Sequence, residues 1–158
     1  MDIKEYFIPI DINTKPYVKA YIIHKLGSQP KLRSKGPKIE SIGNKLFDLL
    51  QHKTNERGAR KNDTRYTAIL RIYIPTGLFK KLGQNLNETN LKQLNLFIEL
   101  EVKQLFCNLM DDLMCHLPSF INNLPEVRRK LEIEPSQWST EAMKQVYYRR
   151  NKNFKGAR

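Results

Sequence analysis

Residues 89–117 read TNLKQLNLFIELEVKQLFCNLMDDLMCHL, and this stretch decides the fold. It contains neither glycine nor proline, the two residues that most strongly interrupt a helix. Its large apolar residues recur at helical spacing and form a wide stripe: Leu94, Phe97, Ile98, Val102, Leu105, Phe106, Leu109, Met110, Leu113 and Met114. The pattern predicts one long, buried helix at the centre of the core or of a homodimer interface.

The clearest strand signal lies upstream, in RYTAILRIYIP at residues 65–75. Apolar side chains occupy alternate positions there, and Pro75 ends the run. Residues 3–12 alternate less regularly and contain Pro9, which restricts them to an edge strand. Together these two segments predict a small antiparallel sheet.

Start and stop signals predict five shorter helices around the long one, at 16–26, 42–51, 76–82, 124–133 and 140–152. Thr14 and Pro16 are expected to open the first, which Gly27 ends, and Ser41 is expected to cap the second. Pro125 should open the fourth, and Ser139 should cap the fifth.

These elements predict an α+β fold that is predominantly helical, with the small antiparallel sheet packed on the long central helix. We divide the chain into an α+β core domain at 1–118 and a basic helical extension at 119–158. The core domain would carry basic loops at 27–40 and 51–65, where glycine, proline and polar residues replace apolar periodicity.

The net charge of +12, from 28 basic and 16 acidic residues, is unevenly distributed. Residues 31–81 hold 13 basic and 4 acidic side chains, and residues 127–158 hold 9 and 3. Residues 85–126, between them, hold 2 and 6. Two basic segments that flank an apolar, mildly acidic middle are typical of proteins that contact phosphates. The predicted partner is therefore a nucleic acid, with DNA preferred to RNA.

The basic loops suit contacts with the DNA backbone or the minor groove, as arginines on arms commonly make. An ordinary solvated loop would have the same composition. The candidate contacts are Lys31, Arg33, Lys35, Lys38, Arg57, Arg60, Lys61 and Arg65.

Residues 66–115 resemble the ribbon-helix-helix family, in which a short strand ends in an Ile-Pro step and leads into two helices. The resemblance implies that strands of a dimer pair and enter the major groove. The resemblance also implies that the side chains of Thr67, Arg71 and Tyr73 face DNA. The first predicted helix is shorter and the second longer than in that family. An ordinary strand in a small α+β domain is the alternative.

Residues 119–152 resemble a helix-turn-helix unit, with a short helix, a turn containing Trp138 and a basic helix. The turn is longer than the common form. The candidate contacts on the last helix are Lys144, Gln145, Tyr148, Arg149, Arg150 and Lys152. Lysine and arginine would neutralise phosphates, and Gln145 and Arg149 have the geometry to read base edges. Non-specific phosphate contact and a solvated helix packed through Trp138 are the alternatives.

Sites for enzymatic chemistry are weakly represented. The tripeptide Glu101-Val102-Lys103 matches part of a metal-dependent nuclease site, but it lies in a predicted helix. The histidines are scattered, so neither a metal nor a cofactor is expected. Cys107 and Cys115 lie two helical turns apart, too far for a disulfide, and are expected to be buried thiols. The prediction is a non-enzymatic protein.

Small size and basicity resemble the minor DNA-binding proteins of phages and mobile elements, which act in transcription regulation, replication or mobilisation. A cytoplasmic homodimer fits this type. Two alternatives stay open: an RNA-binding protein that uses exposed tyrosines, and a virion or inhibitor protein that binds an acidic partner. No apolar run is long enough to cross a membrane, and MDIKEYFIPIDIN is not typical of a secretory signal.

Overall fold

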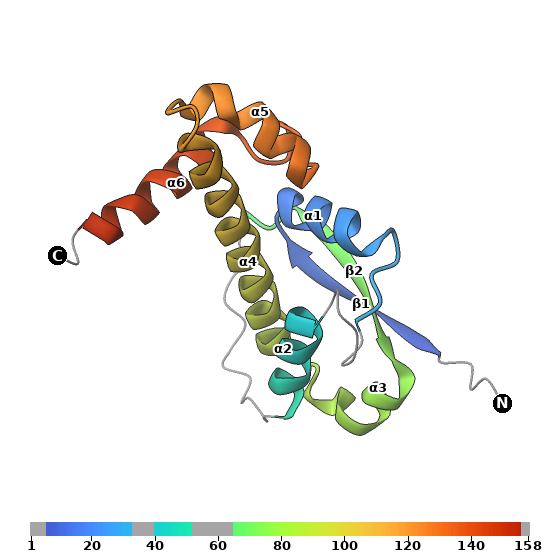
Figure 1. Ribbon diagram of the computed structural model, residues 1–158. Coiled ribbons are helices and arrows are strands. Elements are labelled where there is room, and N and C mark those ends of the chain that lie inside the picture. Colours follow the sequence, from blue (N-terminus) through green and yellow to red (C-terminus); the bar gives the residue numbers. More distant parts are fainter. Residues whose placement is uncertain (1–5, 33–39, 52–64, 156–158) are drawn as a thin grey trace. The chain divides into compact units, whose positions relative to one another are not determined.

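The computed structural model has an α+β fold that is mostly helical, as predicted (Figure 1). The structure describes residues 6–32, 40–51 and 65–155. The elements along the chain are β1 (Phe7–Thr14), α1 (Pro16–Leu26), α2 (Glu40–Gln51), β2 (Ala68–Pro75), α3 (Thr76–Leu82), η1 (Gly83–Asn85), α4 (Glu88–Met114), α5 (Phe120–Leu131) and α6 (Thr140–Lys155).

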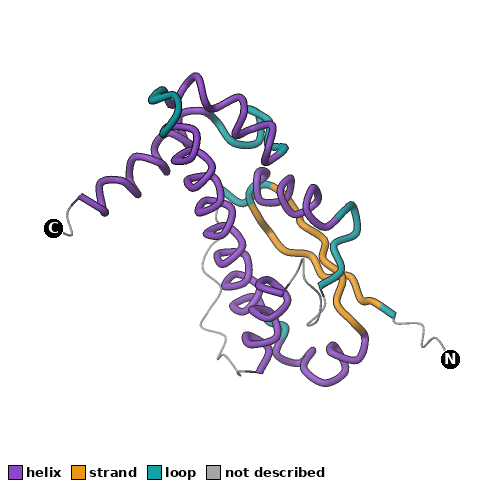
Figure 2. The backbone as a smooth tube through the Cα atoms, in the orientation of Figure 1, coloured by secondary structure: helices purple, strands orange, loops and turns teal. Residues whose placement is uncertain are grey.

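The chain forms two compact units, residues 1–99 and 100–158, and the division falls inside α4. Figure 2 shows α4 as one unbroken helix. Its most deeply buried side chains recur every four residues, each at most 1% exposed: Asn90, Leu94, Ile98, Val102, Phe106 and Met110. Each four-residue step turns the position by about 40° around the helix axis. The buried side of α4 therefore changes along its length, and each half serves the core of its own unit.

The homodimer was predicted because the apolar stripe of α4 was expected to need a partner subunit to cover it. All ten of the large apolar residues that formed this stripe are buried or half-buried within the single chain. Leu96 and Leu100, which lie outside the stripe, are 49% and 65% exposed. A partner subunit is therefore not required to cover the stripe, and the homodimer stays a prediction.

The sheet of the first unit pairs β1 with β2 in antiparallel register, from Phe7 opposite Pro75 to Thr14 opposite Ala68. Leu70, Ile72 and Ile74 are buried, which confirms the predicted period of two. Arg71 alternates with them and is exposed.

Both edges of β2 are occupied within the chain. β1 pairs along its whole length on one side. On the other, the Tyr73 N–H donates to the Pro30 carbonyl and the Leu32 N–H donates to the Tyr73 carbonyl, both at 2.8 Å. Tyr73 and Pro9 face each other as a non-hydrogen-bonded pair of the antiparallel sheet, since the backbone N–H and carbonyl of Tyr73 point away from β1. The backbone of Pro9 therefore faces the outer edge of β1. Proline offers no N–H there, which fits the predicted edge strand.

Helix α1 covers the predicted range, with Pro16 in its first turn and Gly27 at its end in the left-handed region (φ 86°). Thr14 was expected to cap this helix, and this prediction is wrong. Lys15 holds the cap position, and the buried Thr14 hydroxyl donates to Asn95 Oδ1 at 2.5 Å. As the last residue of β1, Thr14 faces the core instead of the helix end. The Ser41 cap is also wrong, because α2 already begins at Glu40.

Two buried side-chain amides, Asn85 of η1 and Asn90 of α4, bond to the end of α2. Asn85 Nδ2 donates to the Leu50 carbonyl at 2.6 Å, and Asn90 Nδ2 donates to the Leu49 carbonyl at 3.1 Å. The last carbonyls of a helix have no partner within it. These side chains therefore satisfy the end of α2 where it enters the core.

In the second unit, α5 begins at Phe120, and Pro125 lies inside it, so the prediction that Pro125 opens this helix is wrong. Ser119 caps the helix by accepting from the Asn122 N–H at 3.4 Å. Proline removes the bond to the Ile121 carbonyl, and the helix tolerates the loss because Ile121 and Pro125 are both exposed to water. Ser139 caps α6, as predicted, and accepts from the Ala142 N–H at 3.2 Å.

Cys107 is buried and Cys115 is exposed, so the expectation of two buried thiols holds for the first only. Cys115 lies in the turn that follows α4. Among the described helices, none is long and apolar enough to span a membrane.

Candidate nucleic-acid interface

An aromatic cluster in the second unit fixes the position of α6. Phe106 on α4 lies at its centre, with ring centroids 5.1 Å from Trp138 and 6.5 Å from both Phe120 and Tyr147. Phe106 is fully buried, and Trp138 is 4% exposed. The cluster thus contains side chains from α4, α5, α6 and the turn before α6, and α6 packs on it through its inner side.

Arg128 organises the turn between α5 and α6. Its Nη2 donates to the Trp138 carbonyl at 2.8 Å and to Thr140 Oγ1 at 3.3 Å. Partial burial lowers the pKa of Arg128 below its usual value. The guanidinium adds side-chain donors to a turn in which the Gln137 and Trp138 N–H groups already donate to the Glu134 carbonyl. Sequence reasoning treated this arginine only as one of several charges, since nothing local marks its partner ten residues away.

The inner side of α6 is fastened to α4 through Asp111. The Tyr147 hydroxyl donates to Asp111 Oδ1 at 2.8 Å, and Arg150 Nη2 pairs with Asp111 Oδ2. Burial, together with this hydrogen bond, raises the pKa of Tyr147. Arg150 also donates to Asn108 Oδ1 at 3.4 Å. Of the two adjacent arginines predicted to contact nucleic acid, Arg150 therefore faces α4.

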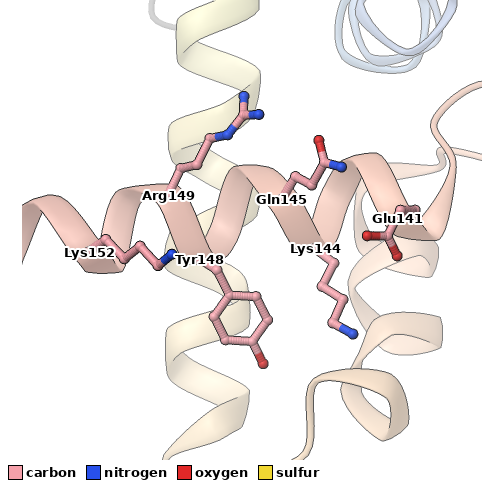
Figure 3. Close-up of a pocket in the computed structure, with 6 residues that line it drawn as sticks. All are labelled: Glu141, Lys144, Gln145, Tyr148, Arg149 and Lys152. Atoms are coloured by element: carbon pink, nitrogen blue, oxygen red, sulfur yellow. The ribbon is translucent and has the colours of Figure 1, made fainter.

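The outer side of α6 presents one continuous polar face (Figure 3), which we call the α6 face. It consists of Glu141, Lys144, Gln145, Tyr148, Arg149 and Lys152. Lys144 and Lys152 lie two helical turns apart, about 12 Å along the axis. All six residues come from a single helix, so the hollow between their side chains is an open surface and not an enclosed cavity. Five of the six predicted contacts on this helix share this face.

The cations of the α6 face lack acidic partners. Within residues 6–32, 40–51 and 65–155, no carboxylate forms an ion pair with Lys144, Arg149 or Lys152. Elsewhere Lys92 pairs with Glu88 at 2.7 Å, and Arg129 pairs with Glu126 at 2.8 Å. A cation beside a carboxylate has most of its field cancelled, whereas an unpaired one attracts external anions. Three such cations on one face form a surface for a polyanion.

The predicted contacts on the sheet are engaged within the first unit. Arg71 Nε donates to Asp11 Oδ1 at 2.7 Å, and its Nη2 donates to Asp11 Oδ2 at 2.9 Å. These bonds hold the pKa of Asp11 below its usual range. Tyr73 is half-buried, and Lys31 places its Nζ 4.9 Å from the centroid of the Phe7 ring. Arg65 is exposed at the start of the segment that leads into β2.

Six predicted contacts lie outside the described residues: Arg33, Lys35, Lys38, Arg57, Arg60 and Lys61. Their predicted contacts with nucleic acid therefore stay a prediction.

The pairing of β2 within this chain differs from the strand pairing that the ribbon-helix-helix resemblance implies. Groove entry of that kind requires the strands of two subunits to pair with each other. In this chain β1 occupies one edge of β2, and residues 30–32 bond to the other at Tyr73. A second subunit would have to displace one of them. We therefore place the candidate interface on α6.

The nuclease-like tripeptide lies within α4, as predicted. Over the described part of the chain, no three histidine, cysteine or acidic side chains gather in a way that could hold a metal ion. Compared with protein-family models, curated protein sequences and solved structures, the chain has no significant match. Its function is therefore inferred from its own residues.

Proposed function

We propose that this protein binds nucleic acid through the α6 face, in the cytoplasm and without a cofactor. The proposal rests on Lys144, Arg149 and Lys152, which lie on one exposed helical face and have no carboxylate partner among the described residues. Duplex DNA is the ligand expected from the sequence, in regulation, replication or mobilisation of a mobile element.

The dimensions of α6 support a groove as one docking position. A helix with its side chains is about 10–12 Å wide, close to the major groove of B-DNA at about 12 Å. Lys144 and Lys152 would contact phosphates, and Gln145 and Arg149 would lie beside base edges between them. The aromatic cluster, to which Tyr147 belongs, and the bonds to Asp111 hold α6 in place. Less conformational entropy of the helix is therefore lost on binding.

Two net-charge-matched triple variants of the full chain test the proposal. The first carries Lys144→Gln, Arg149→Gln and Lys152→Gln, which removes unpaired cations. The second carries Arg71→Gln, Lys92→Gln and Arg129→Gln, which removes cations that are paired with carboxylates. Affinity for a duplex and for a single strand is measured by fluorescence anisotropy over a series of salt concentrations.

The wild-type affinity should fall steeply with salt, because bound phosphates release counterions. The first triple variant should lose about a hundredfold or more in affinity and about two to three units of the salt slope. The second should retain wild-type binding. Equal losses in both variants would show that net charge alone, and not the α6 face, attracts the ligand. A wild-type protein that binds no probe at low salt would refute the proposal and favour an acidic protein as partner.

A further inference from the structure

Tyr148 lies at the centre of the α6 face (Figure 3) and is 43% exposed. Lys144 and Lys152 lie one helical turn before and after it, and Arg149 follows it directly. A large part of this aromatic side chain is therefore in solvent. Its surroundings are those of a residue that meets an anionic ligand with an apolar part.

The Tyr148 ring is held in place by its neighbours. Its centroid lies 6.1 Å from the Phe120 ring, at an angle of 34° between the planes, and 5.6 Å from the Tyr147 ring, at 72°. Tyr147 is itself buried and bonded to Asp111. This chain of contacts limits the rotamers of Tyr148 while leaving part of its ring in solvent. A ring oriented in advance loses little conformational freedom when a ligand packs against it.

An exposed aromatic ring between two cations is suited to contact a nucleic-acid base and its flanking phosphates. Nucleic-acid bases stack on aromatic side chains while lysines and arginines follow the backbone, and each stacked base contributes about 1–3 kcal/mol. In an intact duplex both faces of a base are covered by its neighbours. A base must therefore be unpaired, or unstacked from its neighbour, before a tyrosine ring can lie against it.

The charge at the start of α6 differs from that of a typical recognition helix. Recognition helices contact base edges with their N-terminal residues. The first turn of α6 carries Glu141, whereas Lys144, Arg149 and Lys152 lie further along. An acidic first turn repels phosphates, so the affinity of this face is concentrated around Tyr148.

We infer that Tyr148 stacks on an unpaired base while Lys144 and Lys152 contact the flanking phosphates, so that the site prefers single-stranded nucleic acid or unpaired segments. The inference rests on the proposed function and names its ligand class. Single-stranded DNA and RNA share this chemistry, and the two probes below distinguish them.

The experiment compares the wild type with Tyr148→Ala, Tyr148→Phe and Tyr6→Ala. Tyr6 is a matched control because it is 71% exposed and lies in the other unit. The probes are an oligothymidylate, an oligouridylate, a duplex and an abasic oligodeoxynucleotide of equal length. The abasic strand keeps the phosphates and removes the bases.

The Tyr148→Ala variant should bind the oligothymidylate and the oligouridylate about five- to 150-fold more weakly than the wild type. Its affinity for the abasic strand and the duplex should be nearly unchanged. Tyr148→Phe keeps the ring, so it and Tyr6→Ala should bind like the wild type. The tighter of the two homopolymers identifies DNA or RNA as the better source of unpaired bases.

A second measurement does not require removal of the ring. Trp138, the single tryptophan, is 4% exposed, so a bound strand should not quench wild-type fluorescence. Tyr148→Trp adds an indole at the proposed stacking position. Its fluorescence should be quenched by the oligothymidylate and not by the abasic strand.

Equal weakening of all probes by Tyr148→Ala, or no quenching in Tyr148→Trp, would overturn the stacking inference. The proposed function would then still hold if the wild type binds with a steep salt dependence that the first triple variant removes. Absence of any wild-type binding would instead refute both.

Discussion

Strand β2 and helix α6 each carry an arginine and a tyrosine on their outer side, Arg71 with Tyr73 and Arg149 with Tyr148. The two pairs are alike in the sequence and different in the structure. Arg71 makes two hydrogen bonds to Asp11, and Tyr73 is half-buried with its backbone bonded to residues 30–32. Among the described residues, Arg149 has no acidic partner, and Tyr148 is 43% exposed.

The difference shows that the number of cations is a poor guide to where a polyanion binds. Residues 31–81 hold the larger basic excess, yet Arg71, a described cation in this range, is paired with a carboxylate 60 residues away in sequence. The α6 face has fewer cations, but among the described residues none of them is paired with a carboxylate.

Phe106→Ala should produce the largest change, because it empties the centre of the aromatic cluster that positions α6. We expect a loss of about 3–5 kcal/mol in the free energy of unfolding of the second unit. Denaturation followed by Trp138 fluorescence measures it, since Trp138 contacts Phe106 directly. The control is Phe79→Ala, at 38% exposure in the first unit, which should cost far less. Equal costs would mean that the cluster does not support α6.

The neighbouring arginines of α6 should respond in opposite ways. Arg150→Ala leaves Asp111 without its ion pair, and we expect a stability loss of about 1–2 kcal/mol with a small change in affinity. Arg149→Ala should leave stability unchanged and weaken nucleic-acid binding. Thermal unfolding and anisotropy on the same samples check both. The assignment of Arg150 to the fold fails if its removal weakens binding as strongly as that of Arg149.

The stability of the second unit should decline at alkaline pH through Tyr147. Burial and the Asp111 bond raise its pKa, so the folded state keeps the phenol proton at pH values where the unfolded chain has lost it. The stabilisation is full below about pH 10 and is lost as the pH rises through the folded-state pKa. Tyr147→Phe should cost about 1 kcal/mol at neutral pH and flatten the decline. An identical alkaline profile for the variant and the wild type would assign the decline to other groups.

Asp11→Asn should have the smallest effect and tests the contrast most directly. It releases Arg71 from its carboxylate while keeping a side chain of similar shape. We expect nucleic-acid affinity to rise about two- to fivefold and the salt slope to gain about one unit at most. The matched variant Glu126→Gln releases Arg129 in the same way. If Asp11→Asn binds nucleic acid with unchanged affinity, the ion pair with Asp11 is not the reason that Arg71 makes no contribution to binding.

Local patterns in the sequence were sufficient for most of the elements. The alternation at Leu70, Ile72 and Ile74 predicted β2, and the absence of glycine and proline over residues 89–117 predicted α4. Pro16 and Gly27 marked the bounds of α1 correctly. The wrong predictions, at Thr14, Ser41 and Pro125, concern helix starts. At Thr14 the reason is tertiary, because its hydroxyl bonds to Asn95, 81 residues away, instead of the helix end.

The sequence by itself determined the fold class, the outward face of α6 and the excess of positive charge, because each depends on residue type and on spacing within one element. Only the tertiary structure decided which of the described cations are paired with a carboxylate. Arg71 and Arg150 find carboxylates 60 and 39 residues away, and Tyr148 is oriented by Phe120 on another helix. Such contacts arise from packing between elements, which the order of residues within one segment does not specify.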